Sequence, residues 1–195
     1  MQDRVKHAAT YADLEAVPPH LVAEILFGNL VTHPRPSTEH GAAATSLSDE
    51  LVGPFQKGRG GPGGWIFIGE EEVHLGPHVT VPDIAGWRRE RLPPGSGKTN
   101  VLEIPPDWIC EILSPSTEKY DRGVKRNIYA LYGVEYLWHV DPRVQCLETF
   151  TRSDKSWLLT GTFFDNDEVR AAPFAELAFK LGLLWPFDPP SESTS

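Results

Sequence analysis

The alternation of apolar and polar positions between residues 107 and 141 predicts a strand, a helix and a second strand. The first strand covers a short apolar run, 108–110, and ends on the carboxylate of Glu111. Its β-forming residues and the turn signal that follows are typical of a strand. A helix over about 116–132, with hydroxyl side chains at its start, is expected next, and a second β-rich run covers 136–140. A helix of this length allows the two strands to lie parallel.

Shorter periodic segments surround this unit. Two β-like runs near the N-terminus are joined at Gly28-Asn29, which favours a hairpin. Ser37 or Thr38 can cap a helix that includes Val52. The other predicted strands are an antiparallel pair, 65–75 and 79–87, and two strands in the C-terminal third, 144–151 and 157–162.

Length and composition favour one globular domain. The chain has 195 residues, of which 40% are hydrophobic, and this is enough for a full core. We expect a single domain over residues 1–185 and a flexible tail over 186–195. The formal net charge is −9, from 27 acids and 18 bases, which argues against strong non-specific binding of nucleic acid. Nucleic acid stays open as a substrate, because local basic residues or a bound metal can make the contact.

The chain carries no sequence signal for export or for a membrane. No apolar run reaches the length of a membrane span, and the first ten residues contain no apolar signal core. The two cysteines, Cys110 and Cys146, lie in predicted strands without a CxxC pattern. Buried free thiols in a cytoplasmic protein are the expectation.

Polar residues occur in the 107–141 unit where core packing does not require them. Glu111 lies in an apolar strand, where a carboxylate needs a partner or a metal. Asp121 and Lys125 are four residues apart and share one helix face. The alternative interpretation of these three is an edge-strand glutamate that faces water and a solvated salt bridge of little energetic value.

A second strand carboxylate, Asp83, together with Glu111 predicts a metal site. The Pro82-Asp83 pair lies on the predicted strand 79–87, separate from the strand that carries Glu111. Two carboxylates from neighbouring strands can bind a hard divalent cation, which prefers oxygen ligands and keeps several waters. A nearby lysine can orient or deprotonate the attacking water while the metal stabilises charge on a phosphate.

The segment Gly95–Thr99 looks like part of a phosphate-binding loop, but its context does not fit. The pattern requires a glycine five residues before Gly97, where the chain has Leu92. It also requires an apolar strand before the loop and a helix after it, whereas a basic run, 88–91, precedes it here. A nucleotide-hydrolysing enzyme is therefore a weaker alternative.

The order and spacing of these residues resemble the PD-(D/E)XK nuclease superfamily, and in particular the bacterial restriction endonuclease family formerly known as a domain of unknown function. The matching positions are Glu24, Gly28, His40, Pro82-Asp83, Glu111–Pro115, Asp121, Lys125, Tyr129, Gly133, Glu135-Tyr136 and Val140–Pro142. The resemblance implies a restriction-endonuclease-like α/β fold, with a mixed β-sheet flanked by α-helices. It also implies Mg²⁺-dependent cleavage of phosphodiester bonds, with Mn²⁺ as a substitute metal.

The resemblance assigns roles to individual residues. Asp83 and Glu111 would be metal ligands, and the carbonyl of Ile112 a third. The superfamily pattern places its lysine two residues after the glutamate, where this chain has Leu113, and in the narrower family the lysine has moved to the helix, at Lys125. Asp121 would support Lys125.

Two further candidates keep two interpretations each. Glu24 would complete the metal shell or orient a water, or else belong to a polar strand face. His40 would support the site, or else act as a structural hydrogen-bonding group.

The most basic part of the chain lies between residues 87 and 106. It contains Arg88, Arg89, Arg91 and Lys98, and we expect it to lie near the mouth of the site and contact a phosphate backbone. DNA is the expected substrate. A nuclease fold that binds nucleic acid or a protein without cutting is the main alternative, and a homodimer is an open expectation.

Overall fold

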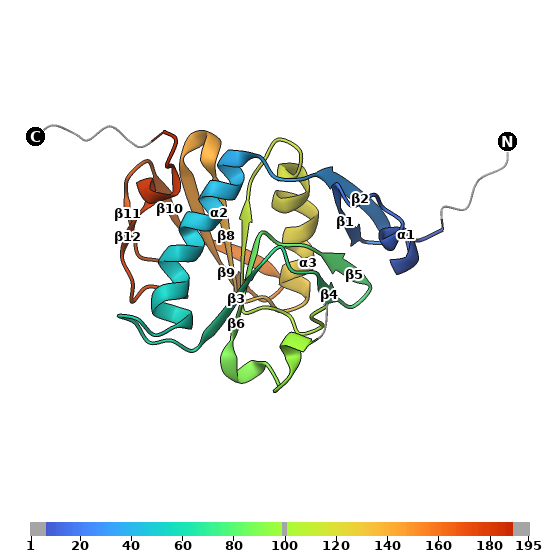
Figure 1. Ribbon diagram of the computed structural model, residues 1–195, viewed down its shortest axis with the longest axis horizontal. Coiled ribbons are helices and arrows are strands. Elements are labelled where there is room, and N and C mark those ends of the chain that lie inside the picture. The colour runs from blue at the N-terminus through green and yellow to red at the C-terminus, as the bar shows by residue number, and fades with distance from the viewer. Residues whose placement is uncertain (1–6, 99–100, 189–195) are drawn as a thin grey trace, which may run out of the picture.

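The central sheet runs through the middle of the molecule (Figure 1). The structure is a computed structural model that describes residues 7–98 and 101–188. Among these residues the strands form three sheets, and the largest has the order β10-β9-β8-β7-β6-β3. Its strands are β3 (Trp65–Gly69), β6 (Ile84–Arg88), β7 (Trp108–Ile112), β8 (Tyr136–Asp141), β9 (Cys146–Ser153) and β10 (Ser156–Phe164). β7 and β8 are parallel, and the other neighbours are antiparallel.

Helices cover both faces of this sheet, as predicted (Figure 1). Alternate residues of a strand point to opposite faces. One face of β7 carries Trp108, Cys110 and Ile112, which pack in one core cluster with α2 (Thr38–Leu51). Ile109 points the other way and packs with α3 (Arg126–Leu131) in a second cluster. Glu111 has the parity of Ile109 and is therefore directed to the side of α3.

The strand–helix–strand unit predicted over 107–141 is confirmed, with one difference in the helix. The segment before α3 is a π-helix, η4 (Tyr120–Lys125), instead of an α-helix. Gly133, with φ +86°, follows the helix and leads to β8. Short π-helical segments often occur at functional sites, and η4 carries both Asp121 and Lys125.

The predicted antiparallel pair over 65–75 and 79–87 is wrong, because each of the two predicted strands is divided into two shorter strands. The chain forms two pairs in two sheets: β3 pairs with β6, whereas β4 (Val73–Leu75) pairs with β5 (His78–Thr80). A left-handed residue after β3, Glu70 with φ +51°, redirects the first segment. Pro82 interrupts the second, since proline cannot donate to a ladder. Asp83 therefore lies in the break just before β6.

The second sheet has the order β2-β1-β5-β4 and includes the predicted N-terminal hairpin. β1 (Leu21–Leu26) and β2 (Asn29–Pro34) are joined by Phe27-Gly28, one residue earlier than predicted. Both turn residues have positive φ, 47° and 72°, as a two-residue hairpin loop requires.

The remaining elements are short. They are α1 (Tyr11–Glu15), the π-helix η1 (Val52–Gln56), β11 (Glu168–Val169), β12 (Phe179–Lys180), and the 3₁₀-helices η2 (Arg89–Arg91), η3 (Ser96–Lys98), η5 (Pro142–Val144) and η6 (Leu181–Leu184). Both cysteines are buried free thiols, as predicted. Over 7–98 and 101–188, no helix has the length and apolar character needed to span a membrane. Residues 189–195, most of the predicted tail, lie outside the described residues.

Candidate active site

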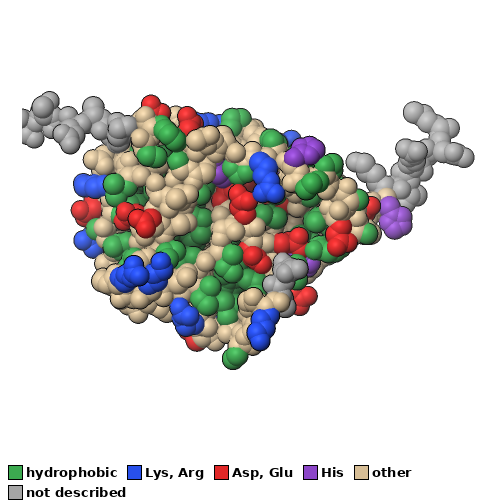
Figure 2. Space-filling model, viewed as in Figure 1, with side chains coloured by type: hydrophobic (Ala, Val, Ile, Leu, Met, Phe, Trp, Pro, Cys, Tyr) green, Lys and Arg blue, Asp and Glu red, His purple; other side chains and the backbone are tan. Residues whose placement is uncertain are grey.

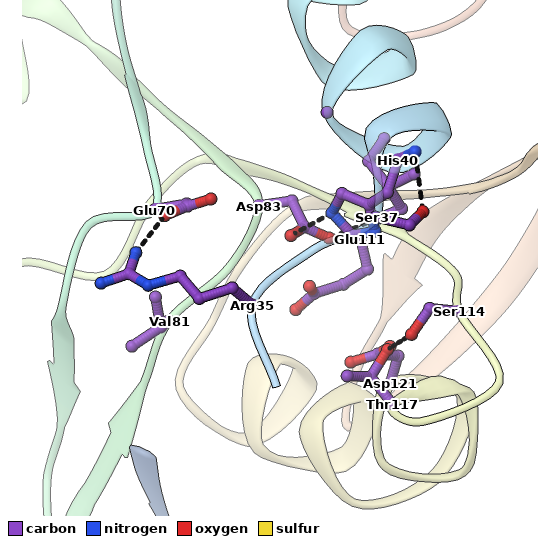
Figure 3. Close-up of polar contacts among 12 residues, drawn as sticks. Arg35, Ser37, His40, Glu70, Val81, Asp83, Glu111, Ser114, Thr117 and Asp121 are labelled. Carbon is purple, nitrogen blue, oxygen red and sulfur yellow. Dashed lines mark hydrogen bonds and ion pairs between the residues drawn. The ribbon is translucent and has the colours of Figure 1, made fainter. Parts of the chain in front are cut away.

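A cavity of about 230 Å³ lies where the start of β6, the end of β7 and η4 meet. Asp83, Glu111, Asp121 and Lys125 line it, together with His40 from the first turn of α2. Figure 3 shows Asp83 and Glu111 directed into the space between α2 and the helix that carries Asp121. The fold therefore brings together the acids of two separate strands and the polar face of the helix.

Asp83 is held from two sides. Its Oδ2 accepts a hydrogen bond from the backbone N–H of Ile112 at 2.6 Å, which ties it to the end of β7. Its Oδ1 lies 2.8 Å from Nε2 of His40, which donates to the carboxylate when that nitrogen carries the proton. The capping side chain of Ser37 accepts from the backbone N–H of His40 and fixes the start of α2. His40 thus positions Asp83, which joins the two interpretations left open for this histidine.

Lys125 is buried beside three carboxylates. Its Nζ lies 2.9 Å from Glu111 Oε1, 3.2 Å from Glu24 Oε1 and 3.3 Å from Asp121 Oδ1. The predicted approach of Lys125 to the acids is observed, whereas the solvated salt bridge is excluded because Asp121 and Lys125 are both buried. Burial lowers the pKa of Lys125, but the attraction of Glu111 and Glu24 outweighs this and raises the pKa well above its usual value. Lys125 is therefore a permanent cation.

Glu111 has the opposite electrostatic situation. Burial raises the pKa of Glu111 well above its usual value; Lys125 opposes the shift, whereas Asp121, Asp83 and Glu24 add to it. Tyr129 donates its hydroxyl to Glu111 Oε1, the same oxygen that faces Lys125.

Glu24 is a buried component of this cluster instead of a polar strand residue. Its Oε1 accepts from the backbone N–H of Val81 at 2.8 Å, and its Oε2 lies 3.6 Å from His33 Nε2. Burial alone would raise the pKa of Glu24, but Lys125, His33 and the Val81 N–H together lower it. Glu24 is therefore ionised and holds Lys125 in place.

The donor set of the cavity fits a divalent cation. Among the described residues that line or adjoin it, the four acids Glu24, Asp83, Glu111 and Asp121 outnumber the two cations Lys125 and Arg35, so negative charge is in excess. Asp121 Oδ2 is buried, and no described residue forms a hydrogen bond with it. No three His, Cys, Asp or Glu side chains within the described ranges converge as a complete metal shell. A metal here would be bound by two carboxylates together with backbone and solvent oxygens, as is common for Mg²⁺.

Comparison with known proteins places the chain in a family. The family model described as "Uma2: Putative restriction endonuclease" matches residues 8–183, most of the chain. The chain belongs to the Uma2 family. A solved structure, the crystal structure of "a putative nuclease belonging to DUF820 from Anabaena variabilis", superposes with a TM-score of 0.72 at 22% identity, over 91% of this chain and 97% of that one. A search of curated proteins gave no match. The restriction-endonuclease-like fold and the family resemblance are thereby confirmed.

The basic loop of this Uma2 protein does not lie at the mouth of the site, and that prediction is wrong. β6 begins just after Asp83, at the cavity, and ends with Arg88 at the other end of the sheet, where the loop forms the lower edge in Figure 1. Arg88 and Arg91 pair there with Asp107, and Arg89 donates to backbone carbonyls. Lys98 ends the short helix η3 in the same loop. The described part of Gly95–Thr99 follows the 3₁₀-helix η2 and forms the 3₁₀-helix η3, and the next described element after it is a strand, β7. It therefore lacks the strand–loop–helix context of a nucleotide-binding loop.

Three further groups contact the cluster, and the sequence had assigned a role to none of them, although Tyr129 was among the positions that carry the family resemblance. Tyr129 contacts Glu111, and its position four residues after Lys125 on the same helix face was a usable signal. Val81 binds Glu24 through its N–H and lies 3.5 Å from Lys125 Nζ through its carbonyl, contacts that only the fold creates. His33 adjoins Glu24 from β2, and nothing in the strand pattern distinguishes it.

Proposed function

We propose that this protein is a Mg²⁺-dependent endonuclease that hydrolyses phosphodiester bonds in DNA. The observation that carries the proposal is the cavity in which Asp83, Glu111 and a buried lysine meet, with more negative than positive charge. Family membership and a nuclease-like fold support the reaction class. A cluster of acids without a metal would repel a phosphodiester, and the overall charge of −9 adds to that repulsion.

Asp83, Glu111 and the carbonyl of Ile112 are the groups that would hold the metal. The hydrogen bond from Ile112 N–H and the contact with His40 already fix the orientation of Asp83, so little reorganisation is needed. A bound Mg²⁺, or Mn²⁺ in its place, supplies a polarised phosphoryl oxygen and a more acidic water. Glu111 would lose any proton that it holds, because the nearby positive charge reverses the repulsion that raises its pKa.

Lys125 would act as a fixed ammonium group beside the reacting phosphate. Its raised pKa disfavours removal of a proton from water, so of the two roles expected from the sequence, orientation of the water is favoured. Glu24 and Asp121 determine where the ammonium group lies, because each binds it from a different element. Leu113, at the usual lysine position, is buried in the core and cannot take this role.

A nicking assay on supercoiled DNA tests the proposal. Cleavage is expected with Mg²⁺ or Mn²⁺ and is expected to stop with excess chelator. Asp83→Asn and Glu111→Gln should each lower the rate by a factor of about 10³ or more, since each removes a charged ligand. The matched control is Asp154→Asn, which makes the same isosteric change at an exposed turn residue.

Two outcomes would contradict the proposal in different ways. Cleavage that persists in chelator, or that survives both substitutions, would place the chemistry outside this cavity. Complete inactivity on DNA and RNA with both metals, combined with retained binding, would favour the alternative of a nuclease fold that binds without cutting.

A further inference from the structure

Arg35 is an exposed cation on the wall of the acidic cavity. It lies between Pro34 and Pro36, in the connection from β2 to Ser37, the cap of α2. Proline restricts its own backbone and that of the preceding residue, so the Cα of Arg35 is held firmly while its long side chain is free to move. Among the described residues that line the cavity, the Lys and Arg side chains are those of Arg35 and Lys125.

The present contacts of Arg35 are weak. Its guanidinium lies 3.4 Å from Glu70 Oε2 and 3.4 Å from the carbonyl of Pro19. The two side chains of the ion pair are 60% and 48% exposed, and exposed pairs of this kind contribute little to stability. Arg143, in contrast, binds Asp141 and Glu118 at 2.7 Å. Arg35 can therefore change partners at small cost, whereas Lys125 is held by three buried acids.

Glu70 lies next to the site through its backbone. Its N–H donates to the carbonyl of Asp83 at 3.2 Å, and Figure 3 shows Arg35 extended toward Glu70 on the side of the cavity where Asp83 lies. Basic side chains are scattered over the face shown in Figure 2 and form no continuous patch. A phosphate that approaches the acidic cavity thus needs a cation close to the metal ligands.

We propose that Arg35 binds a backbone phosphate of the DNA substrate at the cavity mouth. When no substrate is bound, Arg35 instead forms an ion pair with Glu70. This inference rests on the proposed function and extends it to a substrate-binding residue. A guanidinium suits the role because it binds phosphate with two parallel hydrogen bonds, and a carboxylate is the side chain that imitates a phosphate most closely. Substrate binding would exchange one anion for another on the same arginine.

The chain offers a closely matched control pair. Arg170 and Glu168 form an ion pair at 3.3 Å with exposed fractions of 56% and 55%, close to those of Arg35 and Glu70. They lie at β11, which is at the opposite end of the molecule from β1 and β2 in Figure 1. Changes in this pair remove the same charges without touching the cavity.

The experiment measures the affinity of the full chain for a short DNA duplex, with Ca²⁺ in place of Mg²⁺ to limit cleavage. Arg35→Ala is expected to weaken binding about tenfold. It should also reduce the slope of log K against log salt by about 0.9, the value for one phosphate contact. Arg35→Lys should keep the slope, and Arg170→Ala should change neither quantity.

Glu70→Gln is expected to strengthen binding about two- to fivefold. In the Arg35→Ala background, the increase in DNA affinity caused by Glu70→Gln should fall to the increase that the control Glu168→Gln causes.

Parallel nicking assays separate this inference from the proposed function. If the wild-type chain cuts DNA and Arg35→Ala behaves like Arg170→Ala in binding, the role of Arg35 is refuted while the nuclease stands. If DNA is bound but not cut, and Arg35→Ala still weakens binding, Arg35 is supported and catalysis is refuted. A wild-type chain that neither binds nor cuts overturns both.

Discussion

The two ends of strands β6, β7 and β8 carry acids in opposite electrostatic settings. At the end remote from the cavity, Asp107 pairs with Arg88 and Arg91 at 3.1 Å and 2.8 Å, and Glu135 pairs with Arg88 at 3.0 Å. Two acids are balanced there by two arginines. At the cavity end, the described groups are four acids, Glu24, Asp83, Glu111 and Asp121, one buried lysine, Lys125, and the exposed Arg35, which pairs with a different acid, Glu70.

This difference separates acids that stabilise the fold from acids that are retained for chemistry. A buried charge is tolerated when its partners are complete, and it is costly when they are not. An excess of buried carboxylates around one buried cation destabilises the fold. The fold does not require this excess, because at the other end of the same strands the acids are matched by arginines. Perturbed carboxyl groups in a cavity are typical of functional sites.

Removal of Lys125 should destabilise the cavity end most strongly. Lys125→Ala leaves three buried acids without their cation, and we expect a loss of about 3–5 kcal/mol in the free energy of unfolding at neutral pH. Urea denaturation measures this loss. Lys155→Ala, at an exposed turn, is the control and should stay within about 0.5 kcal/mol of the wild type.

A second variant separates charge from packing at the same position. Lys125→Met keeps most of the side-chain volume, and its destabilisation should shrink as the pH falls, because the acids then take up protons and stop repelling one another. A loss that does not change with pH would mean that packing dominates, which would contradict the electrostatic contrast between the two ends.

At the remote end, Asp107→Asn should cost less and leave the site intact. The buried Asp107 accepts from the Arg88 backbone N–H at 2.8 Å and from two guanidinium groups. The amide loses the charge-assisted part of these bonds, so we expect a loss of about 2 kcal/mol in unfolding free energy. Metal-dependent cleavage should be unchanged below the melting temperature. A variant that unfolds normally but no longer cuts would show that the remote end also serves the reaction.

Metal binding should stabilise the cavity end alone. At a Mg²⁺ concentration ten times its dissociation constant, the native state gains about 1.4 kcal/mol. The rise in melting temperature should occur in the wild type and in Asp107→Asn, and should disappear with chelator. Glu111→Gln and Asp83→Asn should lose it. An equal rise in all four proteins would place the metal elsewhere.

Local features of this fold could be predicted from the sequence. The strand–helix–strand unit follows from short-range periodicity, and the spacing of Asp121 and Lys125 placed both on one helix face. The π-helical turn of η4 could not be predicted in this way, because its residues are compatible with an α-helix and the wider turn is seen only in the packed structure.

The positions of distant groups depend on strand direction, which the pattern does not contain. Arg88 lies five residues after Asp83 and seemed near it, yet an extended strand of five residues spans about 17 Å. The loop therefore lies at the opposite end of the sheet from the predicted position. The contact of Val81 with Glu24 and the pairing of Arg88 with Glu135 likewise join segments that are far apart in the chain.

The smallest predicted effect concerns His139, which lies in register with Glu111 on the neighbouring strand but carries no charge. Its ring is buried against Phe150, and within the described part of the chain neither ring nitrogen has a hydrogen-bond partner. Burial, with help from Arg122, Arg126 and Lys125, lowers the pKa of His139 to about 3.

The unfolded chain therefore binds a proton below about pH 6.5 while the native protein does not, so stability is lost as the pH falls toward 3. Between about pH 7 and pH 6 this histidine should account for a loss of about 0.7 kcal/mol, a value determined by the unfolded pKa. His139→Leu should flatten the pH dependence of the unfolding free energy by that amount, whereas His20→Leu, at an exposed position, should not. An unchanged pH slope in His139→Leu would mean that the native protein protonates this ring, and that the cavity end tolerates a further positive charge beside its acids.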